Sequence, residues 1–264
     1  MVTTQDPQVP EILSLPVGEL YSDEPPMESD AHLRQMLLLI SCLDWLWQDR
    51  DDYFASGNLT IYFSPKQIKS RDFRGPDFFV VLGTERRSRK SWVVWEEEGK
   101  YPNAIVEILS ESTAQVDRGT KKQLYQDTFR TPEYFWFDPN TLEFAGFLLI
   151  GGTYEPISAN EAGYLWSRQL DLYLGIHESQ LRFFTPDEQL VPTPLEAAQQ
   201  AQQEAQQIQQ EAQQAQQEAQ QAQQEAQQAQ REAQQAQREV QQAQQRTDRL
   251  AAKLRELGLD PNTI

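Results

Sequence analysis

The sequence predicts a mixed α/β core followed by a long C-terminal helix, and three observations support this fold class. All 27 aromatic residues lie before Thr185, and aromatic side chains supply much of the area that a core buries. Helical and strand-like patterns follow in the order αβββαβ, which is not the regular alternation of a doubly wound sheet. Residues 196–245 contain 26 Gln and 13 Ala but no aromatic residue. We therefore expect a globular domain over residues 27–194 and a Gln/Ala-rich heptad helix over residues 195–264.

The first 26 residues contain five of the fifteen prolines and no sustained apolar period, which predicts an extended N-terminal segment. A helix is expected next, with Ser29 or Asp30 as its N-cap. Its apolar residues have helical spacing; they are Leu33, Met36, Leu37, Ile40, Leu43 and Trp47. Cys42, the single cysteine, is expected to be a small buried residue of this helix. No disulfide and no Cys-based zinc site is therefore expected.

The remaining core elements follow from residue type and from Gly and Pro punctuation. Strands are expected over residues 59–63, 77–82, 104–109, 134–137 and 143–150. The Trp92–Trp95 stretch between the second and third strands is expected to form part of a hairpin. A helix over residues 120–130, which Pro132 ends, is expected between the third and fourth strands.

Two carboxylates occupy strand positions that normally hold apolar residues. Asp77 opens a strand directly after Pro76, and Glu107 stands in the middle of the sequence AIVEIL. A lone buried carboxylate is costly or takes up a proton, so a partner is expected. A shared divalent cation would serve, because Mg²⁺ accepts Asp and Glu oxygens together with water. An ion pair with an arginine, or an edge position that faces water, is the alternative.

Lys121 is a third candidate residue. It shares a helix face with Leu124, Tyr125 and Thr128, so its stem is expected to pack beside core residues, whereas Lys122 points elsewhere. An ammonium group there could hold an attacking hydroxide and stabilise charge on phosphorus. The alternative is an ordinary solvated lysine.

These segments resemble a known family. RGPDFFVVLG, AIVEILSEST, DRGTKKQLY and PEYFWFDP, in this order, resemble the Uma-type restriction endonucleases, a branch of the PD-(D/E)XK nuclease superfamily, over roughly residues 20–180. The resemblance implies a restriction-endonuclease-like αβββαβ core that hydrolyses DNA with Mg²⁺, or with Mn²⁺. It implies that Asp77 and Glu107 are metal ligands and that both are catalytic together with Lys121.

Two positions depart from the superfamily pattern or add to it. The superfamily places a lysine two residues after the glutamate, where this chain has Leu109. In the family that the chain resembles, the lysine lies on the following helix, at the position of Lys121. Glu28 matches an additional acidic residue that some branches place ahead of the first helix. Its alternative role is to interact with the positive end of the helix dipole.

The net charge of −17 argues against a protein that coats nucleic acid through surplus Lys and Arg. The charge is uneven, however, because residues 66–90 hold eight basic and three acidic residues, a balance of +5 around Asp77. Basic side chains of this stretch are expected to contact DNA phosphates; they are Lys66, Lys69, Arg71, Arg74, Arg86 and Arg87. A solvated, charged loop is the alternative.

The tail repeats every seven residues, with Ala, Ile, Val, Thr or Leu at the a and d positions from Ala205 to Leu257. Alanine buries little area, so we expect weak association per heptad, with Leu250, Leu254 and Leu257 as the strongest contacts. Glutamates occupy the g positions and would face glutamines in a parallel pair but one another in an antiparallel pair. A parallel homodimer is therefore favoured. The alternative is a solvated single helix or a partly disordered segment.

No membrane partner is expected, because the longest apolar run, residues 36–43, is far shorter than the ~18–20 residues that cross a bilayer. The N-terminal residues lack the basic character of a signal peptide, and a cytoplasmic location is expected. His32 and His177 have no companion ligands at zinc-site spacing. Two function classes stay open: a Mg²⁺-dependent DNA endonuclease, and a non-catalytic interaction protein that keeps the nuclease-like fold and docks through its tail.

Overall fold

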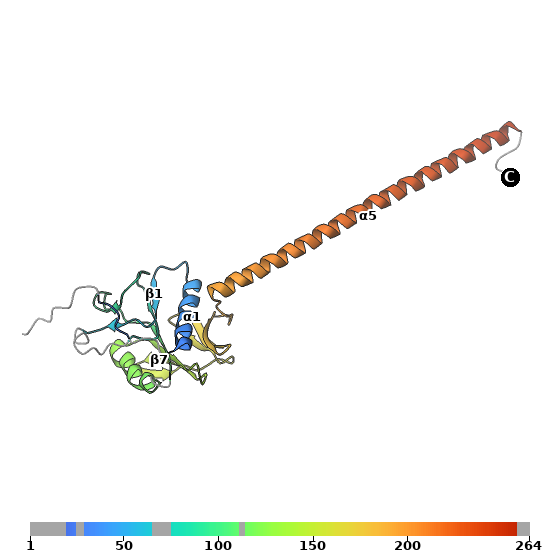
Figure 1. The fold of residues 1–264 in the computed structure, drawn as a ribbon. Coiled ribbons are helices and arrows are strands. Elements are labelled where there is room, and N and C mark those ends of the chain that lie inside the picture. The colour runs from blue at the N-terminus through green and yellow to red at the C-terminus, as the bar shows by residue number, and fades with distance from the viewer. Residues whose placement is uncertain (1–19, 25–28, 65–74, 111–113, 258–264) are drawn as a thin grey trace, which may run out of the picture. The chain divides into compact units, whose positions relative to one another are not determined.

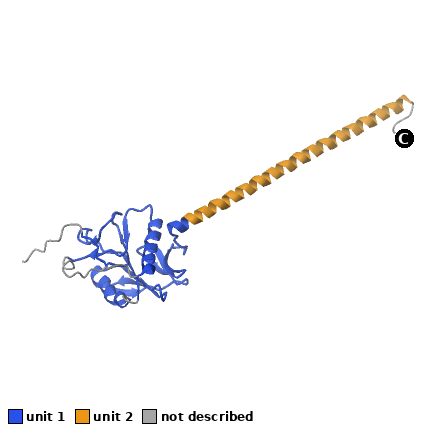
Figure 2. Ribbon diagram, viewed as in Figure 1, with its two compact units in different colours: residues 1–197 blue, residues 198–264 orange. Residues whose placement is uncertain are grey.

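The structure is a computed structural model that describes residues 20–24, 29–64, 75–110 and 114–257 (Figure 1). The chain divides into two compact units, residues 1–197 and residues 198–264 (Figure 2). No helix in the described part of the chain is long and apolar enough to cross a membrane.

A six-stranded sheet forms the centre of the first unit, in the order β1-β3-β5-β6-β7-β8. The pair β5 and β6 is parallel, and the other neighbouring strands are antiparallel. The strands are β1 (Tyr53–Ser56), β3 (Phe78–Leu82), β5 (Ala104–Ile108), β6 (Glu133–Phe137), β7 (Phe144–Ile150) and β8 (Thr153–Pro156).

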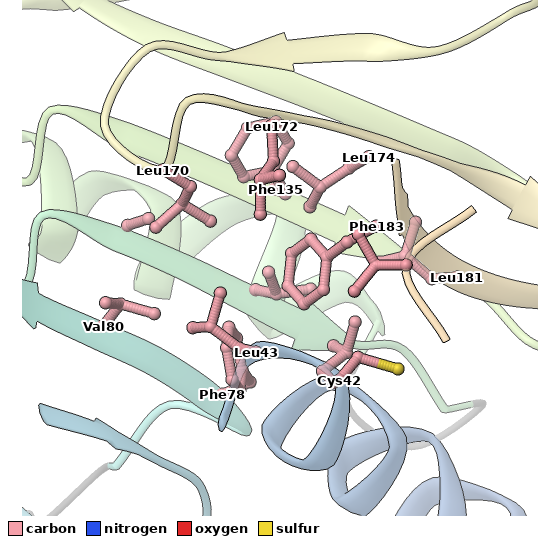
Figure 3. Close-up of a cluster of buried hydrophobic side chains, with 14 of the residues drawn as sticks. Cys42, Leu43, Phe78, Val80, Phe135, Leu170, Leu172, Leu174, Leu181 and Phe183 are labelled. Atoms are coloured by element: carbon pink, nitrogen blue, oxygen red, sulfur yellow. The ribbon is translucent and has the colours of Figure 1, made fainter. Parts of the chain in front are cut away.

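One face of this sheet is covered by α1 (Asp30–Leu46) and by a second, three-stranded sheet. Phe78 and Val80 of β3 point to this face, as the two-residue period of a strand requires, and meet Leu43 of α1 (Figure 3). The three-stranded sheet consists of β9 (Leu165–Ser167), β10 (Leu172–His177) and β11 (Gln180–Phe184). Its leucines and phenylalanines complete this half of the core (Figure 3).

The opposite face is covered by a helical segment and by a two-stranded sheet. The segment consists of α3 (Ala114–Val116), the π-helical turns η1 (Asp117–Lys121) and η2 (Tyr125–Phe129), and α4 (Lys122–Leu124) between them. Arg130 ends it in the left-handed conformation, at φ 55°. The small sheet pairs β2 (Ile61–Tyr62) with β4 (Trp92–Val93).

The order αβββαβ is confirmed, since α1, β1, β3, β5, the helical segment and β6 occur in this order, with β2 and β4 of the small sheet between the central strands. The α1 helix begins as expected, with Ser29 Oγ accepting a hydrogen bond of 3.1 Å from the His32 amide. The hairpin expected at Trp92–Trp95 is wrong, because β4 pairs in parallel with β2. Tight turns after Val93 reverse the chain at once, so no second strand forms there.

Two further elements differ from the expected ranges. The predicted strand over residues 59–63 is reduced to β2, and the first strand of the central sheet is instead β1, which pairs with β3. The helix predicted from residue 120 begins at Ala114, because the chain turns already at Ser110, whose carbonyl accepts the Ala114 amide.

The long helix α5 (Pro194–Glu256) begins with a capping box. The Thr193 amide donates to Glu196 Oε2 at 2.7 Å, and the Glu196 amide donates to Thr193 Oγ1 at 3.2 Å, which satisfies two donors at the helix start. The buried Arg182 also donates to both Glu196 carboxylate oxygens. Pro194 occupies the first helical position, where its missing N–H costs nothing.

Candidate active site

The two predicted carboxylates lie side by side at one end of the β3-β5 pair. Asp77 directly precedes β3, and Phe78 pairs with Val106, the residue before Glu107. The Asp77 amide donates to Glu107 Oε2 at 3.3 Å, and the Ile108 amide donates to Asp77 Oδ2 at 2.8 Å. The fold therefore connects each carboxylate to the backbone that carries the other.

Glu107 is fully buried and receives two side-chain donors from the helical segment. The Tyr125 hydroxyl donates to Oε1 at 2.7 Å, and Lys121 Nζ donates to Oε2 at 3.0 Å. Lys121 Nζ also lies 2.9 Å from Oδ1 of the buried Asp117. The Lys121 side chain is only 12% exposed, so it is not an ordinary solvated lysine.

Leu109 takes no part in this network. It lies on the same strand face as Glu107 but belongs to the buried cluster beneath the helical segment. The ammonium group that contacts Glu107 comes instead from Lys121 of η1. The structure thus places a lysine at the glutamate although the strand position holds leucine.

Three residues of the site were not assigned a role from the sequence. His32 Nε2 of α1 lies 3.0 Å from Asp77 Oδ1, and Asp117 and Tyr125 flank Lys121 at four-residue intervals. The interval from Asp117 to Lys121 spans the π-helical turn η1, and Tyr125 begins the second such turn, η2; π-helical turns are frequent at functional sites. The repeated spacing of Asp, Lys and Tyr was the available signal, whereas nothing in the local sequence pointed from His32 to Asp77.

The buried charges shift one another's pKa values. Burial raises the pKa of Glu107 well above its ordinary value, and the carboxylates of Asp77 and Asp117 raise it further against the opposing effect of Lys121. Burial alone would raise the pKa of Asp77, but the contacts with His32 and Lys121 lower it. Burial alone would lower the pKa of Lys121, yet the three carboxylates raise it. Lys121 therefore carries its positive charge at neutral pH.

The donor set fits a hard divalent cation. When all three carboxylates are ionised, they and the Lys121 ammonium carry a net charge of −2 before His32 is counted, which a divalent ion would balance. No group of three or more His, Cys, Asp or Glu side chains among the described residues is arranged to hold a metal. Asp77 and Glu107 would thus supply two oxygen ligands and leave the rest to water and substrate, as Mg²⁺ accepts. A structural zinc site, with four N or S ligands, does not fit.

The predicted DNA contacts Arg86 and Arg87 do not lie beside Asp77. They follow the other end of β3, whose five residues span about 17 Å. Arg86 Nη2 lies 3.0 Å from Asp44 Oδ1, and Arg87 Nη2 lies 2.7 Å from Glu97 Oε1. The structure therefore does not bring these two residues to Asp77, and their contact with DNA phosphates stays a prediction. The other predicted positions lie outside the described residues; they are Glu28, Lys66, Lys69, Arg71 and Arg74.

The helical tail matches a family model of its own. Residues 195–255 match the family model "Alanine-zipper, major outer membrane lipoprotein". None of the curated proteins compared with the chain matches it. A similar solved structure is the "Crystal structure of a putative nuclease belonging to DUF820 from Anabaena variabilis ATCC 29413", which is 16% identical and has a TM-score of 0.41 over 56% of this chain and 76% of that one.

The globular part matches one family model over most of its length. Residues 10–183 match Uma2, described as "Putative restriction endonuclease". This match spans more than half of the chain and contains every residue of the carboxylate and lysine cluster. The chain therefore belongs to the Uma2 family, as the resemblance of its motifs predicted.

Proposed function

We propose that the protein is a Mg²⁺-dependent DNA endonuclease, with Mn²⁺ as an alternative metal, and that Asp77, Glu107 and Lys121 form its catalytic centre. The observation that carries this proposal is the pair of adjacent carboxylates with a buried ammonium 3.0 Å from one of them. Asp77 and Glu107 would hold the metal. A bound Mg²⁺ would lower the pKa of a coordinated water and neutralise charge on a phosphate oxygen.

The chain's own residues divide the remaining work. Asp77, 15% exposed at its side chain, is the more open of the two carboxylates, and Glu107 is fully buried. Tyr125 and Lys121 each hold one oxygen of Glu107 and so orient this ligand. Because its pKa is raised, Lys121 remains an ammonium group and acts by electrostatic stabilisation of the phosphate rather than as a general base.

DNA binding is the part of the proposal that rests on the sequence. Lys66, Lys69, Arg71 and Arg74 precede Asp77 by three to eleven residues, so this stretch is the source of phosphate contacts that we propose. The negative charge of the rest of the domain would oppose DNA binding away from this basic stretch. Because we propose DNA as the substrate, we also propose a cytoplasmic location for the protein.

We infer that the tail joins two copies of the chain in parallel. The large apolar side chains of its a and d positions are exposed in the single chain, with Leu250 at 58% and Leu257 at 71%. Several g-position glutamates already accept hydrogen bonds from glutamines four residues earlier in their own helix, as Glu211 does from Gln207 at 2.9 Å. A parallel dimer would bring two catalytic units to one DNA molecule, as cutting both strands requires.

The catalytic proposal is tested by cleavage of supercoiled and linear DNA with Mg²⁺ or Mn²⁺. We expect the wild-type chain to cleave, and Asp77→Ala and Glu107→Ala to lose cleavage. Asp127→Ala, which removes an exposed carboxylate from the same helical segment, should retain it. Cleavage that persists in both site variants, or its absence from the wild type with either metal and substrate, would refute the proposal. The absence of cleavage would favour the interaction protein.

Disulfide trapping tests the parallel dimer in the full chain. Under oxidation, Leu250→Cys at a d position should cross-link to its own counterpart, because only a parallel, in-register pair brings the two residues 250 together. Gln245→Cys, at the outward f position, should not cross-link. Equal cross-linking of the two variants, or of neither, would contradict the parallel seam.

A further inference from the structure

Residues 20–24 run along the first unit through hydrogen bonds at every residue. The Leu20 carbonyl accepts from Ser91 Oγ at 2.6 Å, the Tyr21 carbonyl accepts from Tyr62 Oη at 2.7 Å, and the Ser22 amide donates to the Lys90 carbonyl at 3.0 Å. The next two residues, Asp23 and Glu24, both contact Thr60. These contacts fix the segment on β2 and β4 and bring it towards the turn before β3.

Glu24 Oε1 makes two hydrogen bonds at the end of this segment. It accepts from the Gly75 amide at 2.6 Å and from Thr60 Oγ1 at 2.8 Å. Thr60 is fully buried, which gives the carboxylate a fixed anchor. A bond from a backbone amide to a carboxylate is short and about twice as strong as a neutral one.

The Gly75 amide lies two residues before Asp77, with Pro76 between them. Because proline fixes its own φ, one backbone torsion fewer can absorb a displacement of Gly75 before it reaches Asp77. The other side of this turn is closed, because the Asn58 amide donates to the Pro76 carbonyl at 3.1 Å and a Cβ at Gly75 would overlap the backbone of Leu59. The turn is therefore held between residues 58–59 and Glu24.

We propose that Glu24 is a positioning residue, which sets the place of Asp77 in the site through the amide of Gly75. This inference deepens the proposed function and rests on it where activity is concerned. Outer-shell contacts of metal ligands change metal affinity or activity by about 10–100-fold when removed. We expect an effect of this size, since ligand groups must be held to about 0.5 Å.

Hydrogen exchange tests the placement of Asp77 without relying on activity. The Ile108 amide donates to Asp77 Oδ2, whereas the neighbouring Leu109 amide donates to the Phe137 carbonyl of the next strand. In Glu24→Ala, the Ile108 amide should exchange about tenfold faster relative to the Leu109 amide, as for a contact of about 1.4 kcal/mol. An unchanged ratio of the two rates would overturn the inference, whether or not the chain cleaves DNA.

Metal dependence provides the second test. Glu24→Ala should raise the Mn²⁺ concentration for half-saturation of the protein and the Mg²⁺ concentration for half-maximal cleavage by about 10–100-fold. Glu24→Gln, which keeps an accepting oxygen, should bring both metal concentrations most of the way back to their wild-type values. Asp23→Ala, which removes an exposed charge next to Glu24, should change neither concentration. If Glu24→Ala does not fold, Glu24→Asp keeps the charge but shortens the reach, and it should show the same changes to a smaller extent.

The outcomes separate this inference from the proposed function. A wild-type chain that neither binds metal nor cleaves DNA would refute the endonuclease, while the exchange ratio would still decide the role of Glu24. A folded Glu24 variant with wild-type exchange and wild-type metal dependence would refute the positioning role and leave the endonuclease intact.

Discussion

Replacement of Lys121 by methionine tests the charge balance of the site directly. Its Nζ lies 3.0 Å from Glu107 and 2.9 Å from Asp117, both fully buried, and removing one partner of a buried ion pair costs about 3–5 kcal/mol. Proton uptake limits this cost. Protonation of a carboxyl with the ordinary glutamate pKa of 4.5 costs about 1.36 kcal/mol for each pH unit above that pKa. At pH 7, protonation of Glu107 therefore costs about 3.4 kcal/mol. We therefore expect Lys121→Met to lower the free energy of unfolding by about 3 kcal/mol at pH 7.

The same reasoning predicts that this loss shrinks in acid. Burial first of all, and then the neighbouring carboxylates, raise the pKa of Glu107 in the folded state, and the loss of Lys121 raises it further. A carboxyl with a raised folded-state pKa stabilises the fold below its unfolded pKa, and this stabilisation is lost as the pH rises through the folded-state pKa. At pH 5 the cost of protonation is only about 0.7 kcal/mol.

Urea unfolding at pH 5 and pH 7 measures how much Lys121→Met lowers the free energy of unfolding at each pH. Lys122→Met is the matched control, because Lys122 is the next residue and its Nζ lies 3.3 Å from the centroid of the Phe147 ring. Loss of this cation–π contact is expected to cost about 0.5–1 kcal/mol, equally at both pH values. The reasoning is refuted if Lys121→Met is no more destabilising at pH 7 than this control, or if its cost is the same at pH 5.

Three further outcomes are expected from urea unfolding. Hydrogen bonds from a buried arginine lower the pKa of Glu196 to about 2. The wild type should therefore have a higher free energy of unfolding than Glu196→Gln at pH 7, and this difference should disappear as the pH falls from about 4.5 towards about 2. A difference that does not change with pH would contradict this. A Cβ at Gly57 would overlap the carbonyl oxygen of Asp77, so Gly57→Ala should cost about 1–3 kcal/mol. Gly119→Ala, in the open side of a helical turn, should instead gain up to about 1 kcal/mol; equal midpoints would refute the overlap. Tyr125→Phe removes the donor to Glu107 Oε1 and should cost about 1–3 kcal/mol; an unchanged midpoint would show that another donor replaces it.

The parts of the fold that follow from local pattern were predictable. Helical spacing and a capping serine located α1, and runs of β-branched and aromatic residues located the central strands. The pairing of β2 with β4 was not predictable, because the two strands have two residues each and their contact depends on the loops between them. The π-helical turns were not predictable either, since their hydrogen bonds depend on packing against the sheet rather than on residue type.

The candidate site divides in the same way. Asp77 and Glu107 stood out because a charged residue in an apolar strand is a local inconsistency that the sequence itself displays. The contact of Asp77 with His32 and the hydrogen bond from Gly75 to Glu24 join segments 45 or more residues apart in the chain, and no period or motif reports such a contact. The basic residues Arg86 and Arg87 were misplaced for the converse reason. They are near Asp77 in the sequence, but β3 lies between them and Asp77 and separates them in space.

The lysine of this site shows why a shifted residue can still serve the same carboxylate. A strand position two residues after Glu107 and the facing helix position both border the same face of the sheet, so an ammonium from either can reach Oε2. Taking it from the helix frees Leu109 to pack fully buried in the core, where a lysine would have to be paired. In exchange, the helix brings Asp117 to balance Lys121 and Tyr125 to hold Glu107. The glutamate is thus fixed by one helical segment, and the placement of Asp77 is left to α1 and to the turn that Glu24 holds.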